Sequence, residues 1–406
     1  MKRRKVNMEN MNDHAVGIDI GEKESVATYM SPSGDVIEQF TFPMNSDGYK
    51  EFREKIPSET RIAFEASGLA YVVFNKLKSL GYESITFAHP KMISWIVKSK
   101  RKNDHVDSVK LAKLHLVNMI PESHLLSEEE RIFRDLLIQR AKLGQEISRM
   151  KSSIIGYLKR EGLFDSLPES SDNFSEKRRK AMESIRFNND KDVVFKTMLN
   201  RLKFLEDQIP PIEERIRSRA MESEDVKLLM TIPGIDYYLA SLLSSYIGDV
   251  HRFPSESKLA SFFGIVPSNR DSSSITRRGH MSKEGASTAR WALSIAVDTV
   301  KIRNKPIMEY YDHQKERTGS GKLAHVLTMR KLIRMIYHML SNRKPWKYEN
   351  ITLTERKVSD LEDVIEHLER VSMLRIGEEW KISEIPKKSR DIIDELGIPI
   401  MQKSGS

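Results

Sequence analysis

The sequence predicts an α/β domain at its amino-terminal end, followed by two mainly helical segments. Strand and helix signals alternate over residues 15–118, which is typical of an α/β domain. Residues 127–220 are highly charged and poor in glycine, and their apolar side chains recur at helical spacing. Because 406 residues exceed the size of one ordinary core, we expect several domains. Their predicted bounds are 14–120, 127–220 and 224–345, with a charged extension over 346–406.

Three antiparallel strands open the predicted α/β domain. The apolar runs at residues 16–20 and 26–30 are strand-like, and residues 36–42 are rich in β-branched and aromatic side chains. Pro32 and Gly34 place a turn between the second and third strands, so these two form a hairpin.

The rest of this domain alternates helices and strands. Ser46 is the expected N-cap of the first helix, and Gly81 ends the second. Three strands in a meander followed by helix-strand-helix-strand-helix is the order of a ribonuclease-H-like fold. These later elements are predicted at 47–56, 61–66, 69–80, 84–88 and 103–118.

Apolar stripes predict a helical arm over residues 127–220. One stripe in its second half steps alternately by four and three residues, the heptad spacing of helices packed lengthwise. Pro210 and Pro211 interrupt this stripe, so a break is expected there, and residues 165–190 are loop-like. A coiled-coil arm that dimerises or holds nucleic acid fits the pattern, and so do two ordinary amphipathic helices on a core.

The third segment is predicted to be mainly α-helical. Residues 228–235 resemble the hairpin of a helix-hairpin-helix, whose glycine amides can face a phosphate. Residues 259–267 lead into a loop containing Ser272, Ser273 and Ser274. By itself this loop is typical of a phosphate-binding or flexible segment, because a serine needs a base, metal or cation to act as a nucleophile. Basic residues that could bind nucleic acid flank it: Arg277, Arg278, Lys283 and Arg290.

Charge and composition limit the classes of partner and compartment. Lys and Arg exceed Asp and Glu by 67 to 58, a net charge of +9, which favours a polyanionic partner. The chain has no cysteine, which excludes disulfides and thiolate metal sites. The apolar window at 228–248 contains Pro233, Asp236 and several serines and makes a poor membrane span. We expect a cytoplasmic protein that does not bind a membrane.

Four carboxylates form the predicted metal site. Asp19 lies within an apolar strand, where a carboxylate is unfavourable unless it is paired or bound to metal. Glu65 ends the fourth strand, which neighbours the first in a ribonuclease-H-like sheet. Asp104 and Asp107 lie three apart at the start of a helix, on one face. Oxygen ligands of this kind suit Mg²⁺, with Mn²⁺ as the alternative ion.

Bases and helix position allow a second interpretation of part of this site. Two Asp residues near a helix start are commonly a solvated face that the helix dipole favours. Four basic residues directly precede this Asp pair. They could bind a phosphate between themselves and the acidic cluster, or they could simply form a solvated run of charges. These bases are Lys98, Lys100, Arg101 and Lys102.

The motifs in this order resemble the transposases of the insertion-sequence-110 type, also called bridge-RNA-guided recombinases. The resemblance covers about residues 14–340. Its motifs are residues 17–21, 64–68 and 102–107, then 232–235, 259–267, 281–285 and 289–293.

The resemblance implies a RuvC-like domain in which Asp19, Glu65, Asp104 and Asp107 hold magnesium. It also implies that a serine of the C-terminal domain attacks DNA and forms a covalent phosphoserine link. Aligned from Pro267, that serine falls on Ser272, although the family usually has glycine where Ser273 stands. The two halves of the site can come from different subunits of a homo-oligomer, a dimer or tetramer.

The resemblance further implies a structured noncoding bridge RNA that pairs with donor and target DNA. The basic stretch from Lys322 through Arg330, Lys331 and Arg334 to Lys344 is a candidate grip for nucleic-acid backbones, or equally a solvated helix face.

Two other functions remain open at this point. A Holliday-junction nuclease would use water in place of Ser272 and need only the four carboxylates. A non-catalytic nucleic-acid-binding protein would need neither, but all four carboxylates and the serine are present.

Overall fold

The computed structural model describes residues 14–90, 93, 104–272, 275–282, 285–347 and 352–363. The chain divides into two compact units, Met1–Ser127 and Glu128–Ser406. The first unit is mixed α/β and the second is mainly helical.

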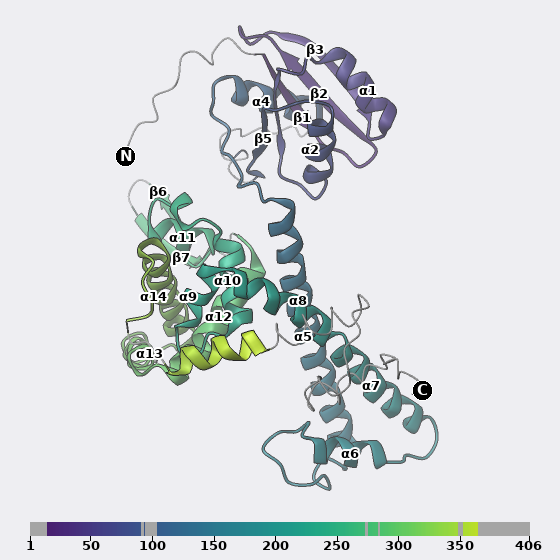
Figure 1. The fold of residues 1–406 in the computed structure, drawn as a ribbon, viewed down its shortest axis with the longest axis vertical. Coiled ribbons are helices and arrows are strands. Elements are labelled where there is room, and N and C mark those ends of the chain that lie inside the picture. Colours follow the sequence, from purple (N-terminus) through teal and green to yellow (C-terminus); the bar gives the residue numbers. More distant parts are fainter. Residues whose placement is uncertain are drawn as a thin grey trace, which may run out of the picture. The chain divides into compact units, whose positions relative to one another are not determined.

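The first unit contains a five-stranded sheet in the order β3-β2-β1-β4-β5 (Figure 1). β1 pairs antiparallel with β2, and β2 pairs antiparallel with β3. β1 also pairs parallel with β4, and β4 pairs parallel with β5. The predicted meander and the neighbouring first and fourth strands are therefore confirmed. The strands are β1 (Ala15–Asp19), β2 (Glu24–Met30), β3 (Val36–Pro43), β4 (Arg61–Glu65) and β5 (Ile85–Ala88).

Helices cover both faces of this sheet. α1 (Ser46–Lys55) and α2 (Ala70–Ser79) pack on one face, where Ile18 and Phe64 belong to a core of buried apolar side chains. α4 (Asp104–Leu116) covers the other face (Figure 1). The predicted N-cap Ser46 is wrong by one residue: the Asn45 side chain accepts the backbone N–H bonds of Asp47 and Gly48.

Helices dominate the second unit. The predicted break at Pro210 and Pro211 is confirmed, because one helix ends at Asp207 and the next begins at Ile209. The loop predicted over 165–190 is wrong in part, since α6 lies within it and buries Met182. The helices of this half are α5 (Glu128–Arg160), α6 (Glu176–Ser184), α7 (Asp190–Asp207) and α8 (Ile209–Glu222).

A large apolar core holds the C-terminal part of this unit together. Its helices are α9 (Glu224–Met230), α10 (Tyr237–Ile247), α11 (Glu256–Phe262), α12 (Ser287–Arg303), α13 (Lys305–Thr318) and α14 (Gly321–Asn342). A 3₁₀ turn, η2, spans Val250–Arg252. Residues 352–363 form one more helix.

The segment predicted as a serine-rich loop folds as a β-hairpin instead. β6 (Pro267–Ser272) pairs antiparallel with β7 (Ile275–Met281). Serine, asparagine and arginine have weak strand propensity, so composition did not indicate strands here. The pairing is anchored at its base, where the Ser282 N–H donates to the Val266 carbonyl.

The predicted hairpin between α9 and α10 is present, but its loop is buried. Gly234 has a φ of 99°, and a Cβ there would lie 2.8 Å from the Thr299 carbonyl oxygen of α12. Glycine is therefore required both for the turn and for close packing. Ile232 and Ile235 on either side are fully buried, so this loop lies in the core of the domain.

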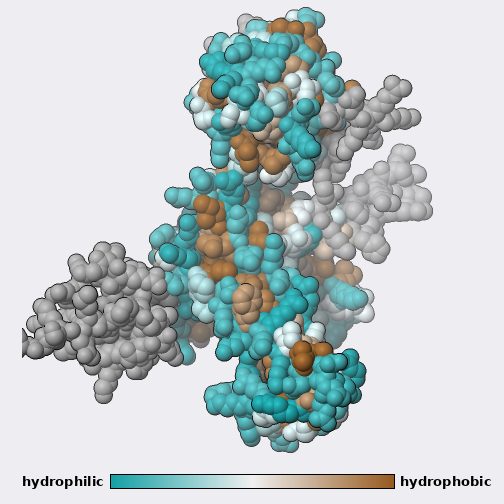
Figure 2. Space-filling view, turned by 90° about the vertical axis from the view of Figure 1, so that its right-hand side faces the viewer, coloured by the Kyte–Doolittle hydropathy of each residue, from teal (hydrophilic) through white to brown (hydrophobic). Residues whose placement is uncertain are grey.

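The visible face in Figure 2 is mainly hydrophilic, with separate hydrophobic patches. Among the described residues, no helix is both long enough and apolar enough to span a bilayer.

Candidate active site

Asp19 and Glu65 are the last residues of two neighbouring parallel strands. Ile18 of β1 is paired with Phe64 of β4. Asp19 and Glu65 are the next residue of each strand, so both carboxylates lie at the same end of the sheet. Neighbouring strands lie about 5 Å apart, and residues in register project to the same face. Asp19 is half-buried and Glu65 is exposed. The sheet therefore brings these two predicted ligands together.

Gly17 identifies the helix that covers this face of the sheet. A Cβ at Gly17 would lie 2.2 Å from the Ser108 carbonyl oxygen and 2.4 Å from the Ala112 backbone nitrogen, so α4 packs directly on the strand. Side chains alternate along a strand, which puts Asp19 on the same face as Gly17. The Thr28 and Ser108 hydroxyls, 2.8 Å apart and buried, hold α4 to β2.

The direction of α4 places its first turns at the carboxylate edge. Arg61, the first residue of β4, donates to the His115 carbonyl (2.8 Å) near the end of α4. The C-terminal end of the helix thus lies at the amino end of β4, and its first turns lie toward the edge that carries Asp19 and Glu65. Asp107 precedes the sheet-facing Leu111 by one helical turn, so it lies on the stripe that faces the sheet.

The four carboxylates differ in what the structure describes of them. The Asp107 carboxylate pairs with Lys110 Nζ at 2.5 Å. Asp104 begins α4, but its side chain lies outside the described residues. Among the described side chains, no three His, Asp or Glu groups lie close enough to hold a metal ion.

The chemistry of the donor set nevertheless fits a hard divalent cation. The set consists of carboxylate oxygens only, and two of them lie at an open sheet edge. Mg²⁺ is held in proteins by one or a few carboxylates together with water and substrate phosphate. Asp19, Glu65, Asp104 and Asp107 are thus suitable ligands by type, and their assembly into one site remains a prediction.

Ser272 is the last residue of β6 and lies opposite Ile275, the first residue of β7. Its side chain and those of Arg277 and Arg278 lie outside the described residues. The predicted basic residues Lys98, Lys100, Arg101, Lys102 and Lys283 also lie outside them. The strand pairing places the Ser272 backbone at the end of the hairpin opposite its base at Pro267 and Met281.

Arg290 supports the base of this hairpin. One guanidinium nitrogen donates to the Gly285 carbonyl at 3.0 Å and contacts the Phe263 carbonyl at 3.5 Å. Gly285 has a φ of 91°, and a Cβ there would lie 2.1 Å from the Phe262 carbonyl oxygen. The predicted nucleic-acid contact of Arg290 remains a prediction; the described contacts are structural.

The structure joins Ser294, His325 and Asp298, a cluster that sequence analysis missed. Ser294 Oγ and His325 Nε2 lie 2.8 Å apart, and His325 Nδ1 lies 3.7 Å from Asp298. Burial lowers the pKa of His325, and Asp298 opposes this change. Ser294 lies in the middle of α12, where the helix occupies neighbouring backbone N–H groups. The cluster links α12 to α14, so its described contacts fit helix packing. No local motif could have found it, because His325 lies on α14.

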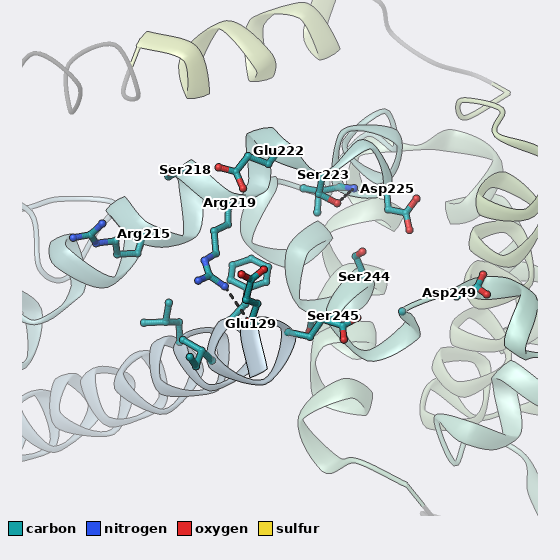
Figure 3. A pocket seen from close by; sticks show the side chains of 16 residues that line it. Glu129, Arg215, Ser218, Arg219, Glu222, Ser223, Asp225, Ser244, Ser245 and Asp249 are labelled. Atoms are coloured by element: carbon teal, nitrogen blue, oxygen red, sulfur yellow. Dashed lines mark hydrogen bonds between the residues drawn. The ribbon is translucent and has the colours of Figure 1, made fainter. Parts of the chain in front are cut away.

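A cavity of about 910 Å³ lies between α5, α8, α9 and α10 (Figure 3). Arg219 reaches across it and donates to the Glu129 backbone carbonyl at 3.0 Å. The other charged groups of its lining are mostly acidic, so the cavity disfavours a phosphate. These are Glu130, Arg215, Glu222, Asp225 and Asp249.

Two transposase families match separate parts of the chain. Residues 16–162 match the family DEDD_Tnp_IS110, described as a transposase. Residues 226–312 match the family described as Transposase IS116/IS110/IS902. The first range contains the four carboxylates and the second contains Ser272.

The chain also resembles individual proteins. It is 22% identical over 283 residues to a putative transposase of Sinorhizobium fredii, covering 68% of the chain and 69% of that protein. It is 22% identical over 277 residues to the transposase for insertion sequence element IS1328 of Yersinia enterocolitica, covering 66% and 79%. It is 30% identical over 121 residues to the pilin gene-inverting protein of Moraxella lacunata, covering 29% and 38%. The chain thus aligns with less than half of the last protein.

Proposed function

Because the chain belongs to the IS116/IS110/IS902 family of transposases, we propose that it excises and inserts a mobile DNA element through a serine-linked intermediate. The reaction cuts and exchanges DNA strands, uses Mg²⁺, and is guided by a structured noncoding RNA. The parallel pairing of β1 with β4 supports this most, because it brings Asp19 and Glu65 to one sheet edge.

In the proposed reaction, Ser272 Oγ attacks a DNA phosphorus and forms a phosphodiester bond to the serine. The bond from that phosphorus to one deoxyribose oxygen breaks, and this oxygen leaves as a hydroxyl group after taking up a proton. The serine hydroxyl gives its proton to solvent. The number of phosphodiester bonds is unchanged, so joining to a new strand is the reverse step with a different hydroxyl.

In this proposal the acidic residues would bind the metal ion that contacts the phosphate, and the serine would be the nucleophile. Asp19, Glu65, Asp104 and Asp107 would hold the metal ion, which when bound stabilises negative charge on the phosphate oxygens. Lys110 balances the charge of Asp107 in the described structure. Arg290 keeps the base of the hairpin in place and thereby positions its tip.

The proposed RNA partner would carry most of the sequence recognition. The net charge of +9 favours nucleic-acid backbones, and backbone contacts position a protein without specifying a sequence. Recombination of element-end and target DNA, measured with and without a transcript of the noncoding DNA beside the gene, tests this part. Equal recombination without the transcript would exclude an RNA guide.

The serine chemistry is tested by replacing Ser272 with Ala and searching for a covalent protein–DNA adduct on a denaturing gel. We expect Ser272→Ala to form no adduct and to lose at least about 100-fold of its strand cleavage. Ser273→Ala and Ser274→Ala are matched controls that should keep both. Full cleavage by Ser272→Ala without an adduct would support the water-using nuclease instead.

A further inference from the structure

The hairpin between α9 and α10 directs three backbone carbonyl oxygens toward one side chain. Lys357 Nζ lies 2.7 Å from the Met230 oxygen, 3.3 Å from the Ile232 oxygen and 2.8 Å from the Ile235 oxygen. Lys357 belongs to the helix at residues 352–363, more than 120 residues away in the sequence. We call these three oxygens the carbonyl cage.

The fold determines the shape of the carbonyl cage before any cation enters it. Met230 ends α9, and the last carbonyls of a helix lack helical partners and carry negative partial charge. Gly234, with its left-handed φ, turns the chain so that the oxygens on both sides of the turn converge. The packing of Gly234 on α12 prevents the loop from opening.

The helix at 352–363 is held over the cage by apolar contacts as well. Leu361 is 2% exposed and belongs to the same core as α9 and α10. Trp346, also 2% exposed, donates its backbone N–H to Thr231 Oγ1 at 2.9 Å. The three partners of Lys357 Nζ are backbone carbonyls, so the cage is made of neutral oxygens. The carboxylate whose charge acts on Lys357 is that of Asp236, which is exposed and already accepts the Leu239 N–H of α10.

A lysine ammonium is a compact point charge with three donors and is strongly hydrated in water. In the cage, three carbonyls replace its hydration. Rings of neutral carbonyl oxygens do the same for bare monovalent cations, whereas divalent cations require carboxylates. Burial lowers the pKa of Lys357 to about 8, and Asp236 opposes this change.

We propose that the carbonyl cage is a monovalent-cation site, which the chain fills with the Lys357 ammonium to fasten the helix at 352–363 to the α9–α10 hairpin. Without this ammonium, the Met230 and Ile235 carbonyls lose the donor described for them, whereas the Ile232 carbonyl keeps the Ile235 N–H. A free cation of suitable size, such as K⁺, then takes the place of the ammonium. The inference is independent of the proposed transposase activity.

The test compares the thermal unfolding of the full-length wild type and Lys357→Ala in potassium chloride and in tetramethylammonium chloride at equal ionic strength. Tetramethylammonium is too large for the cage and cannot donate a hydrogen bond. We expect the wild type to unfold at the same temperature in both salts. Lys357→Ala should unfold on the order of 5 °C lower in the tetramethylammonium salt, and added K⁺ should raise its midpoint in a saturable manner. Hydrogen exchange over 346–363 should show the same recovery.

Two further variants complete the experiment. Lys357→Met keeps the apolar stem, so it separates loss of the charge from loss of packing, and K⁺ should protect it as well. Lys227→Ala on α9 removes a half-buried lysine that pairs with Glu224 outside the cage, and it should show no preference between the salts.

Two results would overturn the proposal. One is a Lys357→Ala protein as stable as the wild type in the tetramethylammonium salt. The other is equal stability of both Lys357 variants in the two salts. If Lys357→Ala does not fold, Lys357→Met decides by the same comparison.

Discussion

Gly17 of β1 and Ser108 of α4 are in such close contact that a single added Cβ on the glycine would lie 2.2 Å from the serine carbonyl oxygen. This contact fixes the distance between the sheet and the helix whose first turns carry two of the predicted metal ligands. The arrangement of the carboxylate edge therefore depends on the absence of a side chain at one strand position.

Replacing Gly17 with Ala should destabilise the first unit. The new Cβ meets the backbone of α4, which cannot move away without breaking the hydrogen bond between Thr28 and Ser108. We expect a loss of about 3 kcal/mol in the free energy of unfolding, measured by urea denaturation. Gly68→Ala is the control, because a Cβ there has no neighbour within 4 Å. Equal stability of the two variants would show that α4 does not pack on β1 as described.

Replacing Asp19 with Asn should abolish metal-dependent DNA cleavage while leaving the fold intact. Asparagine keeps the shape but loses the charge that a metal ion needs, so a loss of at least about 100-fold in strand cleavage is expected. Glu59→Gln, which removes a carboxylate just before β4 at the other edge of the sheet, should cleave normally. Strand exchange by Asp19→Asn in magnesium at the normal rate would contradict the metal site.

Replacing Arg290 with Met should lower the stability of the fold and leave the salt dependence of DNA binding unchanged. Its guanidinium holds carbonyl oxygens at the base of the serine hairpin, so we expect a lower unfolding midpoint. The slope of log affinity against log salt should remain unchanged, because a lost phosphate contact reduces that slope by about one. Lys315→Met, at an exposed position of α13, controls for the lost charge. A reduced slope with normal stability would instead support DNA contact by Arg290.

The first unit should lose stability as the pH falls from neutral. Burial and, to a smaller extent, the nearby Arg61 charge together lower the pKa of His115 from 6.5 to about 3. In the unfolded chain His115 therefore binds a proton below about pH 6.5, whereas in the folded chain it does so only below about pH 3. Stability is fully present above pH 6.5 and falls by about 2 kcal/mol between pH 7 and pH 5.

Urea denaturation at several pH values measures this loss. His115→Gln should remove this part of the pH dependence, whereas replacement of the exposed His105 with Gln should retain it. Identical pH profiles for the wild type and His115→Gln would contradict the assignment to His115.

Local signals in the sequence determined the order of strands and helices in the first unit. Apolar runs, turn residues and helix ends lie within a few residues of one another, so they can be read without knowing the fold. Asp19 and Glu65 were predicted as neighbours because this element order implies adjacent parallel strands, and the register confirms that adjacency. The roles of the four carboxylates and of Ser272 remain predictions.

Only the tertiary structure decided the features that depend on contacts between distant segments. α6 has few apolar residues, and its Arg179 pairs with Glu206 of α7. The β6–β7 hairpin forms from residues with weak strand propensity, because its base is anchored to the core. The carbonyl cage joins Lys357 to a loop over 120 residues earlier. Propensity acts within a few residues, whereas these contacts form only when packing brings remote parts of the chain together.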